Sequence, residues 1–498
     1  MKMHRIPMDT QTVPAPFAVR SSASNPPGGR GDDDDSWAWA TAVSRRVNLD
    51  LALTEAVEAA LNSSGRPEPE VAFVFASSAY GRALDLLVPL LRRLLPSARA
   101  VVGCTGFGVS GTPVGGGAPE EVEHAPAVAV ALARFPGVET RLARVQAEDV
   151  PDGDASPDEW ARLVGLSLDG SGGSSSSAGV NTNFIVISDP SFTGIEELLA
   201  GLDYAFPGSP VCGGLSSSGR LNSARSIFCW SADQDDADST GVQRTGAAVL
   251  ALRGPLTMEL LIAQGCRPLS RHVYTVAAVA PEQRNLVTSL VDSSSGAAFA
   301  PLEALRRDLG EPLQPIASER ELQQVVSNLC CGLKPPDDVF GPFKAASDAP
   351  VPGATAAAAA AAAAASPGGG PDTFFNGGSG GAAAAATTEY LIRGMALTNN
   401  AQLAVGDTPR LGGAFRFMVR DSEGARADLA AHGVAYKRQR LASVLAGRVE
   451  PPAVGALVFS CNGRGAGLYG EESYDARQIG SYVGVPLCGF QCNGPQGN

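Results

Sequence analysis

The sequence VAFVFAS at residues 71–77 is a continuous apolar run that ends in a small polar residue. Residues 84–95 follow with leucines three and four positions apart, and a second apolar run, AVVGC, occupies residues 100–104. Strand, helix and strand in this order and at this spacing are typical of a βαβ unit. Because the runs lack polar alternation, they predict strands that are covered on both faces of a sheet.

The same order of run, helix and run occurs twice more along the chain. The two further copies are FIVIS (184–188), 195–206 and PVCGG (210–214), and then ALVFSC (456–461), 474–482 and PLCG (486–489). Ligands of such sheets gather at the carboxyl ends of the strands. Each copy carries Ser, Cys or Gly at these ends, and glycine lets backbone N–H groups approach a ligand. The alternative is that these glycines only form tight turns.

Other segments have the character of antiparallel strands. Residues 127–133 and 247–252 are apolar, and residues 415–420 alternate as a half-exposed strand does. A helix is expected to begin at Asp421. The predicted fold class is therefore mixed α/β, with mixed sheets built from repeated βαβ units.

Composition limits the classes of function. The chain has 498 residues, of which 44% are hydrophobic, so two or three domains are expected. A net charge of −13 disfavours binding to nucleic acid or anionic lipid, and the sequence lacks an 18-residue strongly apolar stretch, so we expect neither a nucleic-acid partner nor a membrane span. Nine cysteines, an odd and small number, predict free thiols in a reducing compartment.

Composition also breaks the chain into segments. Residues 1–36 are interpreted as a disordered tail or a transit peptide, because they are basic and Ser-rich before the acidic run Asp32–Asp35. Residues 333–388 are rich in Ala and Gly and are interpreted as a low-complexity linker. They separate a predicted domain at 37–332 from one at 389–498. The expected location is the cytoplasm, or the chloroplast or another organelle if the N-terminus is a transit peptide.

Several strings resemble the FIST sensory module, in both its N-terminal and its C-terminal part. They are VVGCT (101–105), GVSG (108–111), PVCGGLS (210–216), QGCRP (264–268), LAVGD (403–407), FSCNGRG (459–465), and GF with CNG in residues 489–494. The string CNGR is specific, whereas a Gly-Gly pair alone is a weak signal. The resemblance covers most of residues 37–332 and 389–498 and implies a two-part FIST-like architecture.

The resemblance implies a sensor of small ligands, such as amino acids, in signalling. Some bacterial relatives are haem-binding gas sensors, and in eukaryotes the module follows an F-box in ubiquitin-ligase adaptors. This chain has no recognisable F-box, and Pro495 replaces the acidic residue after the last CNG string. It ends where relatives continue into a final strand, so the C-terminal part is expected to be truncated, and its sheet to lack an edge strand.

The best candidate ligand site is the cluster Cys461, Asn462, Gly463 and Arg464 at a predicted strand end. A thiol, an amide and a guanidinium could hold a carboxylate, the arginine by a bidentate pair. The alternative is that Asn462 and Gly463 form a turn while Arg464 pairs with Glu471 or Glu472. The other residues predicted to contact the ligand are Cys104, Cys212, Gly213, Gly214, Arg267 and Asn493.

These further residues also have plain structural interpretations. Cys104 and Cys212 are taken to occupy equivalent places in the first two copies, but a buried free cysteine usually acts as a small hydrophobe. Arg267 could equally form a surface or interdomain salt bridge. Cys330 and Cys331 are interpreted as an inert pair at a helix end.

Metal, haem and catalytic chemistry have weak signals. Cys461, Cys488 and Cys492 could bind zinc, but a second pair of closely spaced ligands is missing, so no metal is predicted. No cofactor is expected, and haem held by a lone histidine is the alternative. The candidate histidines are His124, His272 and His432. Phosphate-binding and nucleophile-elbow motifs are absent from the sequence.

Three hypotheses follow. The first is a non-enzymatic sensor of a small ligand, in particular an amino acid or another small anion, with a signalling partner. The second is a substrate-recognition adaptor in ubiquitin-dependent degradation, and the third is a thiol enzyme that uses Cys461. All three assume that the three βαβ units bring their cysteine- and glycine-containing ends together around one cavity.

Overall fold

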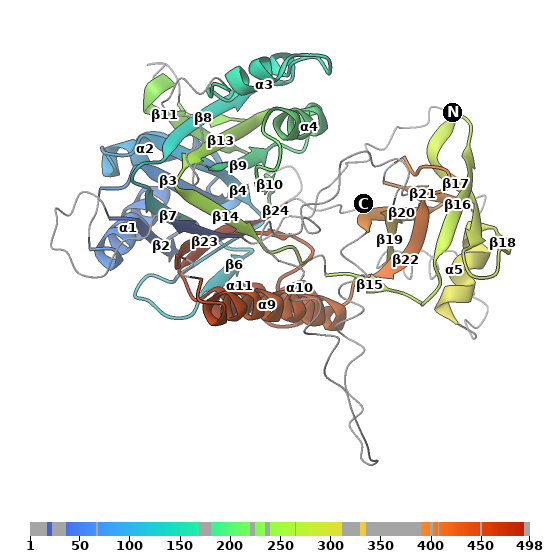
Figure 1. The fold of residues 1–498 in the computed structure, drawn as a ribbon. Coiled ribbons are helices and arrows are strands. Elements are labelled where there is room, and N and C mark those ends of the chain that lie inside the picture. Colours follow the sequence, from blue (N-terminus) through green and yellow to red (C-terminus); the bar gives the residue numbers. More distant parts are fainter. Residues whose placement is uncertain are drawn as a thin grey trace, which may run out of the picture. The chain divides into compact units, whose positions relative to one another are not determined.

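The structure is a computed structural model, and two compact units are recognised in it. It describes residues 17–21, 36–65, 68–168, 181–219, 225–234, 240–263, 265–310, 329–334, 390–398, 402–406, 408–448 and 451–492. Unit 1 consists of Met1–Gly265 and Asp421–Asn498, and unit 2 of Cys266–Arg420 (Figure 1). Most of the predicted tail and of the predicted linker lies outside the described residues.

Unit 1 contains two sheets with the same arrangement of four strands. Their strands are β2 (Ala38–Ser44), β3 (Val71–Ser77), β4 (Ala100–Gly106) and β7 (Val128–Arg134), and then β8 (Glu139–Val145), β9 (Asn181–Ser188), β10 (Val211–Leu215) and β13 (Ala247–Gly254). The orders are β4-β3-β7-β2 and β10-β9-β13-β8. In both, the first pair is parallel, as a βαβ unit requires, and the next two pairs are antiparallel. The first sheet continues beyond β4 with β11 (Ile227–Ser231) and β12 (Val242–Gln243).

A third sheet repeats this arrangement with strands from distant parts of the chain. Its strands are β14 (Leu256–Leu260), β1 (Phe17–Ser21), β23 (Ala453–Cys461), β24 (Leu487–Cys492), β5 (Gly108–Gly111) and β6 (Glu120–Glu123). The order β24-β23-β1-β14 has the same sequence of one parallel and two antiparallel pairs. The place that β7 and β13 take in the other copies is therefore taken by β1.

This strand differs from two expectations. Residues 1–36 were expected to be a tail, yet within them Phe17–Ser21 pairs with both β14 and β23. The sheet was expected to lack a strand after residue 492, but β1 occupies the neighbouring position on β23. The short apolar run FAV at residues 17–19 is sufficient for a strand because two existing strands supply hydrogen-bond partners on either side.

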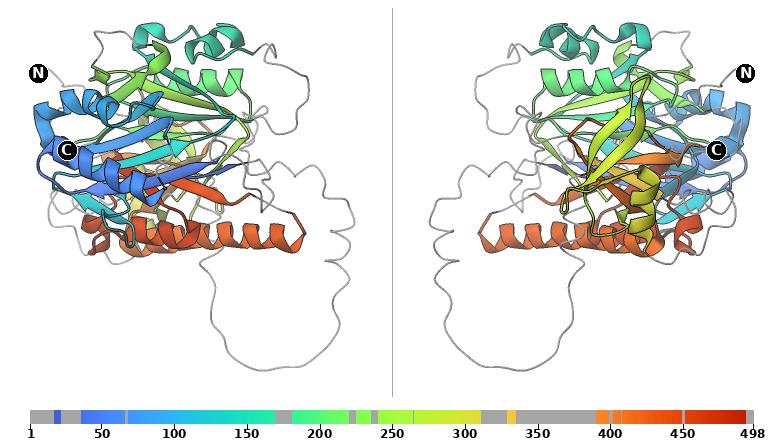
Figure 2. Two further views of the ribbon diagram at one scale, coloured as in Figure 1. Left: turned by 90° about the vertical axis from the view of Figure 1, so that its left-hand side faces the viewer. Right: turned by 90° about the vertical axis from the view of Figure 1, so that its right-hand side faces the viewer.

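Each sheet of unit 1 has helices on one face and a shared core on the other (Figure 2). The helices are α1 (Leu49–Ser63), η2 (Ser78–Leu86) and α2 (Leu87–Leu94), then η3 (Ala147–Asp149), α3 (Pro157–Leu163), α4 (Ile195–Ala205) and η4 (Ala232–Gln234), and then α9 (Ser422–Leu445), α10 (Ala466–Tyr469) and α11 (Tyr474–Val483). Equivalent side chains point inward, namely Phe75, Ile187 and Phe459, and the mixed α/β class is confirmed. Among the described residues, no helix is long and apolar enough to span a membrane.

The three copies share one close backbone approach. Gly103, Gly213 and Gly489 lie opposite Val74, Val186 and Val458 on the neighbouring parallel strand. A Cβ atom on these glycines would lie 1.7, 1.7 and 1.8 Å from the carbonyl oxygen of the facing valine. Only glycine fits, so these positions define how the copies correspond.

This register corrects the predicted equivalence of the cysteines. Cys104 follows its glycine, whereas Cys212 precedes its own, so the two are not equivalent. Cys104 corresponds to Gly214 in the second copy, and Cys212 corresponds to Cys488 in the third. The sequence alone does not contain the strand pairing that fixes which residues of the copies correspond.

Unit 2 is a closed antiparallel barrel of six strands. They are β16 (Tyr274–Ala280), β17 (Gln283–Asp292), β21 (Leu403–Val405), β20 (Leu391–Leu397), β19 (Leu329–Lys334) and β22 (Ala414–Val419), and β22 pairs with both β19 and β16. The elements β15 (Arg267–Pro268), β18 (Ala298–Phe299) and α5 (Pro301–Leu309) complete the unit. Phe415 and Phe417 point into its core, as their alternation predicts. Cys330 and Cys331 lie within β19, so their predicted position at a helix end is wrong.

Unit 2 is inserted into the third copy of unit 1. In the first two copies the edge strand leads into a helix within a short stretch of chain, β2 into α1 and β8 through η3 into α3. In the third copy β14 is separated from α9 by the whole of Cys266–Arg420. The third copy therefore needs residues from both ends of the chain.

The Gly489→Ala substitution is expected to destabilise unit 1 strongly, because its methyl group would overlap the Val458 carbonyl. Overpacking of this kind costs about 1–3 kcal/mol, and more where backbone must move. Urea unfolding followed by circular dichroism measures the loss. Gly467→Ala, whose methyl group meets no atom within 4 Å, is the matched control. Equal stability of the two variants would contradict the close approach.

Candidate functional site

The carboxyl ends of the three βαβ units meet at one end of unit 1. Ser217, which follows β10, connects them: its N–H donates to the Thr105 carbonyl at 2.9 Å, and its Oγ accepts from the Phe107 N–H at 2.6 Å. The same hydroxyl donates to the Gln491 carbonyl on β24. One side chain of the second copy is thus bonded to the first and the third.

The predicted cysteine and glycine positions come together but are tightly packed. A Cβ atom on Gly214 would lie 2.3 Å from Cys492 Sγ. Cys104 belongs to the same buried core as Cys492, and burial, together with that neighbouring thiol, raises the pKa of Cys104. Cys212 packs with its sulfur 3.5 Å from Met258 Sδ. These thiols therefore act as small core side chains, and not as ligand contacts, which is the alternative that the sequence left open for Cys104 and Cys212.

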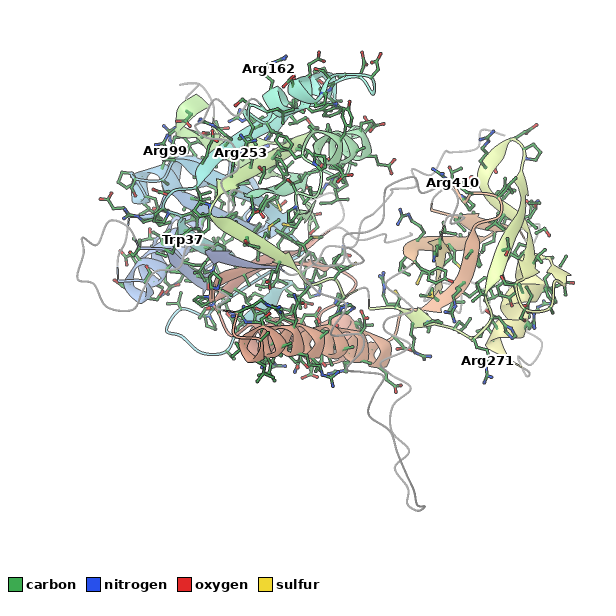
Figure 3. The ribbon with its side chains drawn as sticks, in the orientation of Figure 1. Trp37, Arg99, Arg162, Arg253, Arg271 and Arg410 are labelled. Carbon is green, nitrogen blue, oxygen red and sulfur yellow. The ribbon has the colours of Figure 1, made fainter. Side chains whose placement is uncertain are left out.

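Two hollows in the described surface lie elsewhere. One, of about 430 Å³, is lined by Arg92, Arg93 and Trp230. The other, of about 590 Å³, lies beside Asp149 of η3 and Arg162 of α3, and Figure 3 labels Arg162. Neither is lined by a residue predicted to bind the ligand, so the converged strand ends do not enclose either of these hollows.

The loop after β23 forms a tight turn. Asn462 N–H donates to the Cys492 carbonyl at 2.9 Å, and Arg464 N–H donates to the Cys461 carbonyl at 2.9 Å. The Cys461 thiol, 7% exposed, accepts from the Gly463 N–H at 3.4 Å. Asn462 and Gly463 remain half-buried at the surface. The turn that sequence reasoning offered as the alternative is therefore present.

Arg464 is buried in an ion pair, and this corrects its expected partners. Its Nε and Nη2 donate to the two carboxylate oxygens of Asp475 at 2.5 and 3.0 Å, and Nη2 also reaches the Tyr469 hydroxyl at 2.6 Å. Burial lowers the pKa of Arg464, but the charge of Asp475 and the hydrogen bond to it raise that pKa above its ordinary value. The predicted partner Glu471 instead pairs with Arg426 and Arg477.

The same ion pair explains a glycine of the QGCRP string. A Cβ atom on Gly265 would lie 2.3 Å from Arg464 Nη1, and Gly265 has a left-handed φ of +68°. Its N–H donates to Asp428 Oδ2 at 3.0 Å. Arg464 thus contacts α11, α10 and the loop after β14. The edge of its guanidinium that could bind a ligand carboxylate in bidentate fashion is already bound to Asp475.

The remaining predicted residues lie apart from this cluster or outside the described part. Arg267 lies in unit 2, where it is exposed on β15 opposite Val419. Gly213 is half-buried on β10. Asn493 lies outside the described residues.

A group of buried polar residues behind Arg464 was missed by sequence reasoning. Glu121 is only 4% exposed, and among the described residues its carboxylate makes no short hydrogen bond, although the Ala476 N–H in the first turn of α11 faces it and lowers its pKa. Burial raises the pKa of Glu121 to about 8, helped by the charges of Asp475 and Glu123 and opposed by Arg464. Glu123 accepts from Gln491 Nε2 at 2.9 Å. The acids at alternate positions of the string EEVE (120–123) were the available signal.

A second missed acid stands at the end of β9. Asp189 takes the place of Cys461 in the second copy, three residues after the facing valine. It is buried, accepts from the Ser191 N–H at 2.8 Å and pairs with Arg225 at 3.1 Å. Within the described ranges, His, Cys, Asp and Glu side chains do not gather in threes that could hold a metal ion.

The stability of unit 1 is expected to fall as pH rises from about 5 to 8. Glu121 binds its proton more tightly in the folded chain, with a pKa of about 8, than in the unfolded chain, so the unfolding free energy decreases until pH exceeds that value. Each unit of pKa difference corresponds to about 1.4 kcal/mol. Urea unfolding at several pH values measures this slope. Glu121→Gln should flatten it, whereas Glu120→Gln should not, and equal slopes would refute the assignment.

Two family models match the chain. The model of the FIST N domain matches residues 70–292, and that of the FIST C domain matches residues 346–498. Together they cover more than half of the chain. Their boundaries differ from those of the compact units, because the third copy of unit 1 uses residues from both matched regions.

Mycobacterial proteins of similar length are related over most of their sequence. Uncharacterized protein Rv0628c of Mycobacterium tuberculosis (strain ATCC 25618 / H37Rv) is 26% identical over 459 residues, which is 91% of this chain and 93% of that protein. Uncharacterized protein Mb0898c of Mycobacterium bovis (strain ATCC BAA-935 / AF2122/97) is 27% identical over 464 residues, 91% of this chain and 94% of that protein. The motifs at both ends of the chain and the two matched models agree, and the chain belongs to the FIST family, with a FIST N domain and a FIST C domain.

Proposed function

We propose that this protein is a non-enzymatic sensor that binds a small polar ligand where the carboxyl ends of the three βαβ units meet. FIST domains are associated with small-ligand sensing in signal transduction. The observation that carries the proposal is the position of Ser217, which bonds to the ends of both other copies. A ligand at this end would touch all three copies at once.

Backbone groups and Asn462 are the proposed contacts. Strand β10 stands at the edge of its sheet, so alternate N–H and C=O groups of Val211–Leu215 point away from β9. Gly213 and Gly214 carry no side chain and are both half-buried, and Gly214 packs against Cys492 Sγ. The guanidinium of Arg464 is already paired with Asp475. The carboxylate of an amino acid would therefore be held by backbone N–H groups and by the Asn462 amide.

Signalling would follow from a shift in population between arrangements of the strand ends. The hydrogen bonds of Ser217 join elements that are far apart in sequence, namely β4, β10 and β24. A ligand that binds one arrangement of these ends more tightly favours it by its difference in affinity. A protein partner that binds the surface formed by the three ends would then bind one arrangement more tightly than the other.

Binding is favoured over thiol chemistry by the state of four core cysteines. Burial raises the pKa of Cys104, Cys212, Cys488 and Cys492, which keeps these thiols protonated and unreactive. All nine cysteines are buried thiols that form no disulfide, which supports a reducing compartment such as the cytoplasm. The ubiquitin-adaptor hypothesis and the use of Cys461 as a nucleophile stay predictions, because no contact of the described residues favours either.

A thermal-shift screen with the twenty amino acids and small dicarboxylates tests the proposal. At least one compound should raise the melting temperature in a saturable way, because it binds only the native chain. Asn462→Ala should weaken that ligand about tenfold, the effect of losing about 1.4 kcal/mol of binding.

The control is Asn62→Ala, which removes the same side chain from the exposed end of α1. It should bind the ligand as the unaltered chain does. A screen without any saturable shift, or equal binding by both variants, would contradict the proposed location.

A further inference from the structure

Three sulfur-containing side chains lie together inside unit 2. They belong to Cys266, just before β15, to Cys330 on β19 and to Met418 on β22, and they form one buried cluster with Tyr390 and Ile392. The Cys330 thiol donates to Cys266 Sγ at 3.5 Å. Two thiols and a thioether from three separate segments of the chain therefore share one place in the fold.

Strand pairing explains why these side chains meet. Strand β22 pairs with β19 along one edge, where Cys330 lies opposite Met418, and with β15 along the other edge, where Pro268 lies opposite the same Met418 (Figure 1). Side chains directly opposite each other lie on one face of a sheet, with Cβ atoms about 4.5–5.5 Å apart. Met418 is thus central, and its flexible side chain can adjust to its neighbours.

The cluster is dry and closed from solvent. Cys266, Cys330 and Met418 are each at most 7% exposed. Tyr390 covers the same face of β19, because a Cβ atom on Gly332, two residues after Cys330, would lie only 2.9 Å from Tyr390 Cβ. Within the described residues, His, Asp and Glu side chains do not join the two thiols to make a set of three. The third available ligand atom is therefore the thioether sulfur.

The two adjacent cysteines of β19 have different surroundings. Cys331 points to the opposite face, into the barrel core with Phe415 and Phe417, and its thiol donates to the Arg393 carbonyl at 3.6 Å. The sequence suggested one inert pair, whereas the structure places only Cys330 among the other sulfur atoms. Cys331 therefore provides a control for any role of Cys330.

The type of ligand atom favours a soft ion. Thiolates and thioethers select Cu(I), whereas zinc sites in proteins use four ligands drawn from Cys, His and carboxylates. The hydrogen bond to Cys266 and burial raise the pKa of Cys330, and the positive charge of Arg420 opposes this rise. Because two thiolates around Cu(I) carry one net negative charge, the same arginine would favour the filled site.

We propose that Cys266, Cys330 and Met418 form a trigonal binding site for Cu(I) within unit 2. Binding breaks two S–H bonds, forms three Cu–S bonds and releases two protons to solvent, and the copper remains monovalent. Metal–sulfur bonds of about 2.3 Å at 120° hold two sulfur atoms about 4 Å apart, so the two thiols need to separate by only about 0.5 Å. The site is independent of the ligand proposed at the strand ends of unit 1.

The position of the site gives the copper a structural consequence. Cys266 is the first residue of unit 2, and the N–H of Gly265 before it is held by Asp428 of unit 1 at 3.0 Å. A copper ion would fasten the segment that enters unit 2 to both β19 and β22. Cu(I) should therefore stabilise the barrel where its chain begins.

The test titrates Cu(I) into the full chain without oxygen, with ascorbate to keep the copper reduced and the coloured chelator bicinchoninate as competitor. The chain should remove one equivalent of copper from the chelator, and X-ray absorption of the complex should show sulfur neighbours without nitrogen. An excess of Zn(II) should not displace this copper. Displacement by zinc, or nitrogen among the copper ligands, would overturn the proposal.

Variants locate the site. Cys330→Ala should lose this equivalent of copper, whereas Cys331→Ala, altered at the adjacent residue on the opposite face, should keep it. Met418→Leu conserves the volume of the side chain but removes its sulfur, so the chain should fold and bind Cu(I) about tenfold more weakly, a loss of about 1.4 kcal/mol. Equal copper binding by the two cysteine variants, or unchanged affinity of Met418→Leu, would refute the assignment.

Discussion

The structure of unit 1 depends on one steric constraint, the contact of a glycine backbone with a valine carbonyl on the adjacent parallel strand. It occurs three times, at Gly103, Gly213 and Gly489, and in each case a single added carbon atom would overlap the facing oxygen. Because the contact fixes the register of each parallel pair, it also fixes where the strands end. The meeting of these ends around Ser217 follows from that common register, and so does the location proposed for the ligand.

The sequence shows the repeat, but it does not show which residues of the three copies correspond. Continuous apolar runs with helices between them predicted the three βαβ units, since alternation of run and helix is a local property of the chain. Which cysteine corresponds to which depends on strand pairing, so Cys104 and Cys212 were wrongly matched. The barrel of unit 2 was missed because two of its paired strands, β19 and β20, lie on either side of the long low-complexity sequence.

The candidate site was predicted in position but not in chemistry. The CNGR string indicated the loop after β23, and Cys461 and Asn462 do lie at a converged strand end. Arg464 was expected to reach a ligand or a neighbouring glutamate, whereas the first turn of α11 brings Asp475 beneath it. Glu121 was overlooked because an acid on an ordinary-looking strand reveals its burial only when the covering helix is placed. Tertiary packing decides such pairings, and a single sequence does not contain it in a local pattern.

Strand β1 gives the N-terminal segment an unusual importance. It lies between β14 and β23, so it is an internal strand of the third sheet although it comes from the first 21 residues. Proteolytic removal of this segment, as maturation of an imported precursor would require, would separate those two strands and leave the backbone groups of both edges unpaired. A chain cut between Ser21 and Ser36 would hold β1 only through its pairing with β14 and β23, so the third copy would depend on a strand without a covalent link to the rest of unit 1.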